Sequence, residues 1–183
     1  MTDAATRARP DSRSQATYQV RLGWGHAGLS QLAQSGIVIV VDAIGEADEL
    51  AAAAAELGHA PTVFRASLRN ATATARAAYE EQVARGGRTA INLVLAGDED
   101  GAFAVEDYLA AGAVGDALSA LGIDHSAPDV AVATEGFRPL TRALKHLLSA
   151  SAAGLALAEA GRRDEVKAAA ELDADPVAVR FAN

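Results

Sequence analysis

The sequence predicts an α/β fold, a single layered domain in which a central, mostly parallel sheet is flanked by helices. Short and almost wholly apolar runs, such as residues 37–41 and 90–96, are typical of strands that are buried on both faces. Stretches with apolar residues every three or four positions come between such runs, as expected for helices that pack on a sheet. Because the two kinds of segment alternate along the chain, parallel strands joined by helices are expected.

The expected elements follow a polar segment, residues 1–16, which we predict to be a disordered N-terminal tail because it has no periodicity. The α/β domain is then expected to cover residues 17–183. Strands are predicted at 18–22, 37–41, 62–64 and 90–96, with an edge strand at 176–181. A short helix is predicted before Gly36, and further helices are predicted at 46–57, 71–85, 103–121, 128–133, 140–148, 151–163 and 164–172. We expect Tyr79 and Val83 to point inward from their helix, Phe103 to lie on the apolar stripe of the helix at 103–121, and Pro139 to start the helix at 140–148.

The stretch 89–121 combines a buried strand, an acidic turn at 98–101 and a helix whose apolar residues form one stripe. Glu106 and Asp107 fall in the first turns of that helix, just past the carboxyl end of the strand. In open α/β sheets, ligands bind at that edge. The alternative is that the two acids only stabilise the start of the helix through its dipole.

Composition limits the functions that need to be considered. The chain has 183 residues, a formal charge of -8 and a pI of about 4.9. An acidic surface argues against nucleic acid as a partner but allows a small anionic ligand in a local pocket. The absence of Cys excludes thiolate chemistry, and no apolar run approaches the ~18 residues that cross a membrane. We expect a cytoplasmic protein with no membrane partner, and a homo-oligomer is left open.

Four further polar residues follow predicted strands. Asp42 ends the strand at 37–41, where it is either a metal ligand or general base or a cap of the next helix. Arg65 and Arg69 lie on the loop after the third strand, and a guanidinium there suits a phosphate or sulfonate, although many surface arginines have no specific role. Asn70 falls where it would cap a helix.

A glycine-rich stretch, Gly23-Trp24-Gly25-His26-Ala27-Gly28, matches the spacing of a dinucleotide-binding loop between a strand and a helix. The following helix is short, because Gly36 ends it. Trp24 is bulky for a turn that closely surrounds a phosphate, and Asp42 comes early for the acid that binds a ribose. The stretch alone is therefore a weak indication of a nucleotide site.

Several short segments of the chain form a set of motifs. They are Leu95-Ala96-Gly97, Gly101-Ala102-Phe103-Ala104-Val105-Glu106-Asp107 and Ala110-Ala111-Gly112-Ala113, with Val38 to Asp42 and Ser67-Leu68-Arg69-Asn70-Ala71 as further parts of the set. Together these motifs resemble those of the 2-phosphosulfolactate phosphatases. The similarity covers most of residues 18–181, and the Glu-Asp segment is its most specific part.

The resemblance implies a Mg²⁺-dependent hydrolase of α/β fold that converts 2-phospho-3-sulfolactate, or a related small phosphate ester, to the hydroxy acid and phosphate in coenzyme M biosynthesis. By position it implies that Asp42, Glu106 and Asp107 are catalytic and hold the metal, since Mg²⁺ prefers carboxylate oxygen and water. Arg65, Arg69 and Asn70 would then bind the substrate.

The chain also departs from the family pattern. Ala43-Ile44-Gly45-Glu46 replaces a cluster of Ser and Thr after the strand-ending Asp, the middle region between Gly58 and Thr62 is shortened, and Leu95 stands in place of a cysteine. Ala104 replaces the Ser that precedes the Glu-Asp pair. These departures support an alternative in which the chain is a non-catalytic relative that binds a ligand or a partner.

Overall fold

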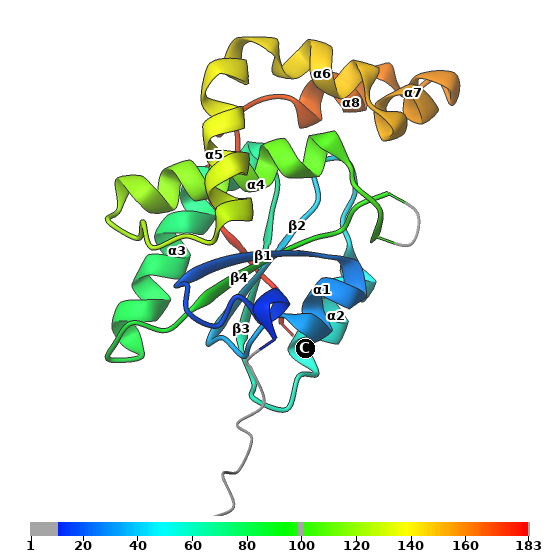
Figure 1. Cartoon of the computed structure of the whole chain (residues 1–183). Coiled ribbons are helices and arrows are strands. Elements are labelled where there is room, and N and C mark those ends of the chain that lie inside the picture. Colours follow the sequence, from blue (N-terminus) through cyan, green and yellow to red (C-terminus); the bar gives the residue numbers. More distant parts are fainter. Residues whose placement is uncertain (1–10, 99–100, 183) are drawn as a thin grey trace, which may run out of the picture.

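A computed structural model, which describes residues 11–98 and 101–182, confirms the α/β fold (Figure 1). In this part of the chain five strands form one sheet in the order β1-β4-β2-β3-β5. The first four strands are parallel, and the edge strand β5 is antiparallel to β3. The strands are β1 (Val20–Trp24), β2 (Ile37–Val41), β3 (Thr62–Ala66), β4 (Ile91–Leu95) and β5 (Val179–Arg180).

The helices connect and cover these strands. The α-helices are α1 (Gly25–Gln31), α2 (Asp48–Ala55), α3 (Ala71–Ala84), α4 (Val105–Ala120), α5 (Pro128–Leu140), α6 (Leu144–Ala150), α7 (Ala152–Glu159) and α8 (Arg163–Ala169). Short 3-10 helices are η1 (Ser12–Ser14), η2 (Leu68–Asn70) and η4 (Thr141–Ala143). No helix in the described part of the chain is both long and apolar enough to cross a membrane.

Two cores lie on the two faces of the sheet, because successive side chains of a strand point to opposite faces. In β2, Ile37, Ile39 and Val41 contact the core beneath α3 and α4, whereas Val38 and Val40 contact the core beneath α2. All five side chains of β2 are almost fully buried. Each contributes roughly 1.5–3 kcal/mol of burial free energy, so the central strand is a rigid support for the residues that follow it.

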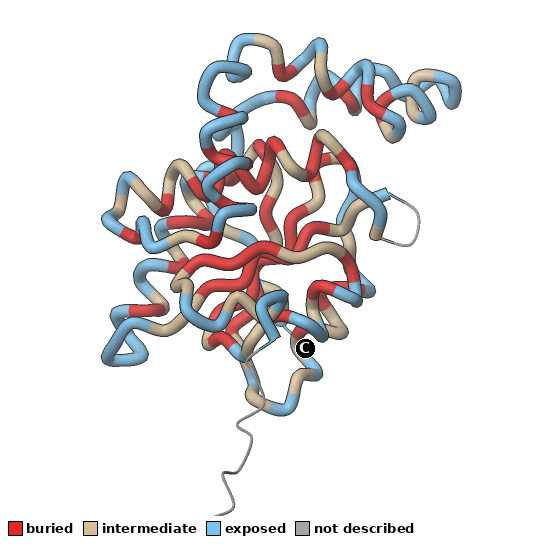
Figure 2. The backbone as a smooth tube through the Cα atoms, viewed as in Figure 1, coloured by how far each residue is buried: buried red, intermediate tan, exposed pale blue. Residues whose placement is uncertain are grey.

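Helix α4 differs from its predicted form. It is buried around most of its circumference, because the sheet packs on one side of it and α5 on the other (Figure 2). The predicted single apolar stripe is therefore wrong for this helix. Phe103, placed on that stripe, precedes the helix and is 62% exposed, and Tyr79 and Val83, expected to point inward from α3, are also exposed.

Two boundaries also differ from expectation. The predicted helix start at Pro139 is wrong, because α5 continues through Pro139 and the chain bends only at η4, beyond which α6, α7 and α8 pack on one another (Figure 1). Residues 1–10 of the expected tail lie outside the described residues. Residues 11–16 are ordered against the domain, since Gln15 binds the backbone of Leu22 through both ends of its amide.

Candidate functional site

The candidate site lies between β2 and β4, where the sheet topology changes direction. These two strands are adjacent and parallel, with Val41 opposite Leu95. The chain leaves β2 toward α2 on one face of the sheet and leaves β4 toward α4 on the other. In open α/β sheets, ligands bind beyond the carboxyl ends of strands that diverge in this way, and this place in the fold is called the β2/β4 crevice. Asp42 directly follows β2, and Glu106 and Asp107 begin α4.

Asp107 joins the two strand ends. Its Oδ1 accepts a hydrogen bond from the Ala43 N–H and its Oδ2 one from the Gly97 N–H, both at 2.8 Å. Gly97 presents its N–H from a backbone with φ of 75°, which favours glycine. Asp107 is only 2% exposed. Its carboxylate therefore fixes the loops after β2 and β4 to the start of α4. Asp107 thus does more than stabilise the start of the helix through its dipole.

Asp42 is surrounded by the loop that it begins. Its carboxylate accepts hydrogen bonds from the Ile44 and Ala47 N–H groups, and a Cβ added to Gly45 would lie 2.5 Å from its Oδ2. Helix α2 starts only at Asp48, and its N-cap residue is Ala47. Asp42 therefore shapes the loop before α2 and does not cap the helix itself.

Glu106 provides the contrast, since it is 4% exposed yet makes no hydrogen bond or ion pair within residues 11–98 and 101–182. It is close enough to Asp42 and Asp107 to act on both electrostatically. A carboxylate beside other acids and without such a partner is available as a cation ligand.

Several acids lie close together in the crevice, and this raises the pKa values of two of them. Burial raises the pKa of Asp107 to about 7, and the neighbouring Asp42 and Glu106 charges add to this effect against the two N–H bonds. Burial also raises the pKa of Asp42, with further contributions from Glu106 and Glu46. None of these carboxylates forms an ion pair with a basic side chain of the described residues.

The three residues predicted to bind substrate have other partners. Arg65 pairs with Asp48 at the start of α2, although its Nε has no hydrogen-bond partner within the described part. Asn70 closes the turn of η2, accepting from the Ser67 N–H at 2.9 Å and donating to the Arg65 carbonyl at 3.2 Å. Its side chain therefore does not cap α3 as the sequence suggested.

Arg69 connects the C-terminal segment to the sheet. Its Nε and Nη2 donate to Asp175 at 2.8 and 2.9 Å, and its Nη1 donates to the Ala168 carbonyl and to Glu171 at 2.7 and 3.1 Å. Hydrogen bonds to Asp175 and Glu171 raise the Arg69 pKa. All three guanidinium nitrogens are thus engaged, so the structure gives Arg69 a role in joining elements of the fold.

A hollow of ≈ 510 Å³ adjoins the loop after Asp42, between that loop, η2 and helices α7 and α8. Gly45 and Glu46 line it on one side, and Arg162 and Glu165 line it on the other. Arg162 was not predicted as a site residue, because it lies in a polar stretch far from any predicted strand end. Its position after Gly161, a helix stop, was the only available signal.

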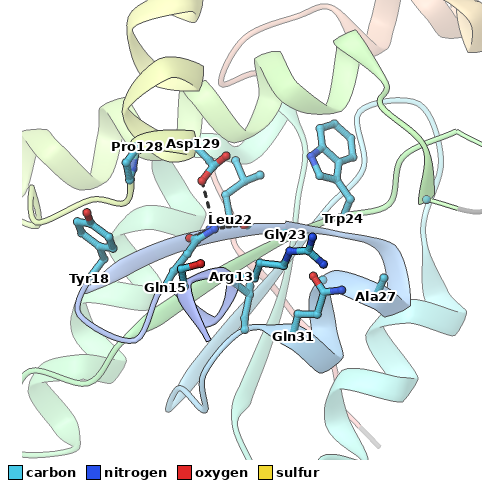
Figure 3. Close-up of a pocket in the computed structure, with 14 residues that line it drawn as sticks. Arg13, Gln15, Tyr18, Leu22, Gly23, Trp24, Ala27, Gln31, Pro128 and Asp129 are labelled. Atoms are coloured by element: carbon cyan, nitrogen blue, oxygen red, sulfur yellow. Dashed lines mark hydrogen bonds between the residues drawn. The ribbon is translucent and has the colours of Figure 1, made fainter. Parts of the chain in front are cut away.

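The glycine-rich stretch lies beside a different hollow, of ≈ 560 Å³, over the edge strand β1 (Figure 3). A Cβ on Gly28 would lie 2.5 Å from the carbonyl carbon of Gly23, so these glycines permit close packing of α1 on β1. The Gln15 amide lies between Leu22 and Asp129, to which it donates at 2.9 and 3.2 Å (Figure 3). The stretch thus has a packing role at the sheet edge, and an added Cβ on Gly25 would lie 3.1 Å from the Gly101 Cα in the loop after β4.

The family pattern implies a bound Mg²⁺, so the side chains of the crevice should be able to bind this ion. No group of three or more His, Asp or Glu side chains in the described ranges is arranged to hold a metal ion. Asp107 already accepts two N–H bonds, whereas Glu106 has no partner there. Mg²⁺ commonly uses one or two carboxylates together with water and substrate phosphate. Asp42 and Glu106 fit that requirement, with Asp107 as support.

The fold and the crevice define an α/β protein with an acidic site at the carboxyl edge of a parallel sheet. Over residues 46–183 the sequence matches the family described as 2-phosphosulpholactate phosphatase. The chain belongs to this family, as its motifs suggested. A comparison with curated proteins found no match.

Proposed function

We propose that the chain is a Mg²⁺-dependent phosphatase that hydrolyses 2-phospho-3-sulfolactate, or a closely related small phosphate ester, in the cytoplasm as a step of coenzyme M synthesis. The observation that carries the proposal is the position of Asp42 and Glu106 at the β2/β4 crevice, where the charge of Glu106 raises the pKa of Asp42. These acids come from distant parts of the sequence, and Glu106 makes no hydrogen bond or ion pair within the described residues. Membership of the phosphatase family supports the choice of reaction.

In this proposal Asp42 and Glu106 hold the metal ion. The ion would polarise the phosphoryl oxygens and offset their charge. Asp107 is a positioning residue, because its two N–H bonds set the loop that carries Asp42 and the loop after β4. This replaces the direct metal contact that the sequence predicted for Asp107.

A cation is needed on physical grounds. Acids repel one another around the crevice: the charges of Glu106 and Glu46 act on Asp42, and those of Asp42 and Glu106 act on Asp107. Without a compensating positive charge they would repel a phosphate ester. The basic side chains predicted to supply that charge, Arg65 and Arg69, are paired with acids.

A second candidate is a non-catalytic family relative that binds a ligand or a partner. It is favoured by Glu46, which lines the hollow in the segment where the family pattern has hydroxyl residues. An acid there weakens the attraction for a phosphate group, so a chain that had lost turnover could retain the fold.

Release of phosphate from 2-phospho-3-sulfolactate distinguishes the two candidates. We expect release that requires millimolar Mg²⁺, stops when the metal is chelated and is lost in Asp42→Asn. Glu49→Gln is the matched control, because Glu49 is an exposed acid on α2. No release by the unmodified protein at millimolar Mg²⁺ would reject the phosphatase and leave the binding module.

A further inference from the structure

The hollow beside the Asp42 loop has features of a subsite for a second anionic group. Gly45 forms part of its wall, and a Cβ on Gly45 would lie 2.5 Å from Asp42 Oδ2. Gly45 therefore adjoins both the hollow and the Asp42 carboxylate, so a small molecule bound at Asp42 would lie next to the hollow.

Four charged side chains line the hollow, those of Glu46, Arg69, Arg162 and Glu165. The nitrogens of Arg69 are all bonded to the C-terminal segment, as described above. Arg162 donates from Nε and Nη2 to the two carboxylate oxygens of Glu165, at 2.7 and 2.5 Å. Its Nη1 has no partner within the described residues, so Arg162 is the guanidinium in this hollow that retains a donor.

The position of Arg162 is fixed by the turn between α7 and α8. Its backbone N–H donates to the Leu157 carbonyl at 2.8 Å, and Gly161 before it takes a φ of 78°. This arrangement closes the end of a helix through a left-handed glycine. The turn therefore holds the base of the Arg162 side chain at the rim of the hollow, while the guanidinium is half exposed and can change partner.

We propose that Arg162 is a specificity-determining residue that binds the sulfonate of the substrate, and that its guanidinium binds Glu165 when no sulfonate is present. The inference rests on the proposed function for the identity of the substrate. A planar guanidinium binds an oxyanion through two parallel N–H bonds. Glu165 makes that contact within the free protein. A sulfonate would compete with Glu165 for the same donors, so the two residues should have opposite effects on binding.

The test measures binding of 3-sulfolactate by calorimetry, which does not depend on turnover. Arg162→Gln is expected to weaken binding roughly tenfold, because a charge-assisted pair is lost. Glu165→Gln is expected to strengthen it, because the competing carboxylate is gone. An exposed pair adds little to stability, so neither variant should shift the melting temperature appreciably.

A matched control pair is present on α5, where Arg138 and Glu135 form another exposed ion pair three residues apart. Neither residue lines the hollow, so Arg138→Gln and Glu135→Gln should leave binding unchanged. If Arg162→Gln and Glu165→Gln change affinity in the same direction, or if neither the unmodified protein nor Glu165→Gln binds 3-sulfolactate, the inference is wrong.

The result can be separated from that of the proposed function. Where turnover is observed, Arg162→Gln should raise KM for 2-phospho-3-sulfolactate but not for 2-phospholactate, which lacks the sulfonate. Equal effects on both esters would overturn the inference and leave the phosphatase intact. Opposite effects of the two variants on 3-sulfolactate binding without any phosphate release would uphold the subsite and reject the phosphatase.

Discussion

Two regions of the molecule are rich in charge, the β2/β4 crevice and the Arg69 junction, where Arg69 binds Ala168, Glu171 and Asp175. They are built in opposite ways. In the crevice, Glu106 and Asp107 are buried and share the space with Asp42, with no basic partner in the described part of the chain. At the junction, Arg69 is partly exposed and each of its nitrogens meets an acceptor. The junction satisfies its charges within the described residues, whereas the crevice does not do so within those residues.

This difference separates a functional arrangement from a structural one. Buried acids that repel one another reduce stability, and such arrangements are concentrated at sites of binding or catalysis. Exposed pairs contribute little each, and they mainly fix one element against another. The following predictions test this comparison, from the largest expected effect to the smallest.

Glu106→Gln should separate activity from stability most strongly. We expect phosphate release to fall by roughly two orders of magnitude or more, since a metal ligand contributes several kcal/mol to a transition state. The free energy of unfolding at pH 8 should stay the same or rise, because a buried charge beside Asp42 is removed. Steady-state kinetics and urea unfolding measure the two effects, with Glu49→Gln as control. A loss of both activity and stability would indicate a structural role for Glu106.

Asp107→Asn should lower stability at pH 8, because an amide supplies one acceptor where the ionised Asp107 supplies two to the Ala43 and Gly97 N–H groups. The expected loss is roughly 1–3 kcal/mol.

The loss should depend on pH. The Asp107 pKa is raised to about 7 in the folded protein, so its protonation stabilises the fold at low pH and that contribution disappears as pH rises through 7. The difference between the unmodified protein and Asp107→Asn should therefore be larger at pH 5 than at pH 8. Urea unfolding at both values tests this, with Asp124→Asn as control, because Asp124 is exposed. An equal difference at both pH values would contradict the raised pKa.

Gly45→Ala should disturb Asp42 without changing any charge. The new Cβ would lie 2.5 Å from Asp42 Oδ2, so the carboxylate must move. We expect the affinity for Mg²⁺ to fall roughly tenfold, which corresponds to about 1.4 kcal/mol. Gly58→Ala is the control, because nothing lies within 4 Å of a Cβ there. Equal Mg²⁺ affinities in the two variants would show that Asp42 is not held by this loop.

Arg69→Gln should have the smallest effect. We expect a loss of about 1 kcal/mol of stability that shrinks in high salt, with KM unchanged, because its ion pairs are partly exposed. Thermal unfolding at two salt concentrations and a kinetic assay measure these effects, and Arg138→Gln reports an exposed pair away from the site. A raised KM in Arg69→Gln would instead restore the role in substrate binding that the sequence predicted.

The sequence predicted the fold and the family better than the packing. Continuous apolar runs identify strands buried on both faces, which is why β2 and β4 were found with bounds close to those observed. The burial of α4 on several sides was missed, because Ala and Gly pack closely wherever a neighbour approaches and therefore show no stripe. Pro139 was taken as a helix start, although it lies near the end of α5.

The position of the acids could be predicted from the sequence, whereas their hydrogen bonds could not. Acids after a buried strand and at the start of the next helix must meet at one edge of a parallel sheet, so Asp42, Glu106 and Asp107 could be named from the sequence. Their different hydrogen bonding could not, because it depends on the N–H groups of Ala43 and Gly97. The partners of Arg69 lie about a hundred residues further along the chain, and no local pattern indicates them.

Direct titration of the protein with Mg²⁺ by calorimetry at pH 8 tests the central claim that Asp42 and Glu106 form a cation site between β2 and β4. The account predicts one binding event in the unmodified protein that is lost in Asp42→Asn and in Glu106→Gln and retained in Glu49→Gln. Absence of binding to the unmodified protein, or binding that survives both substitutions, would contradict it.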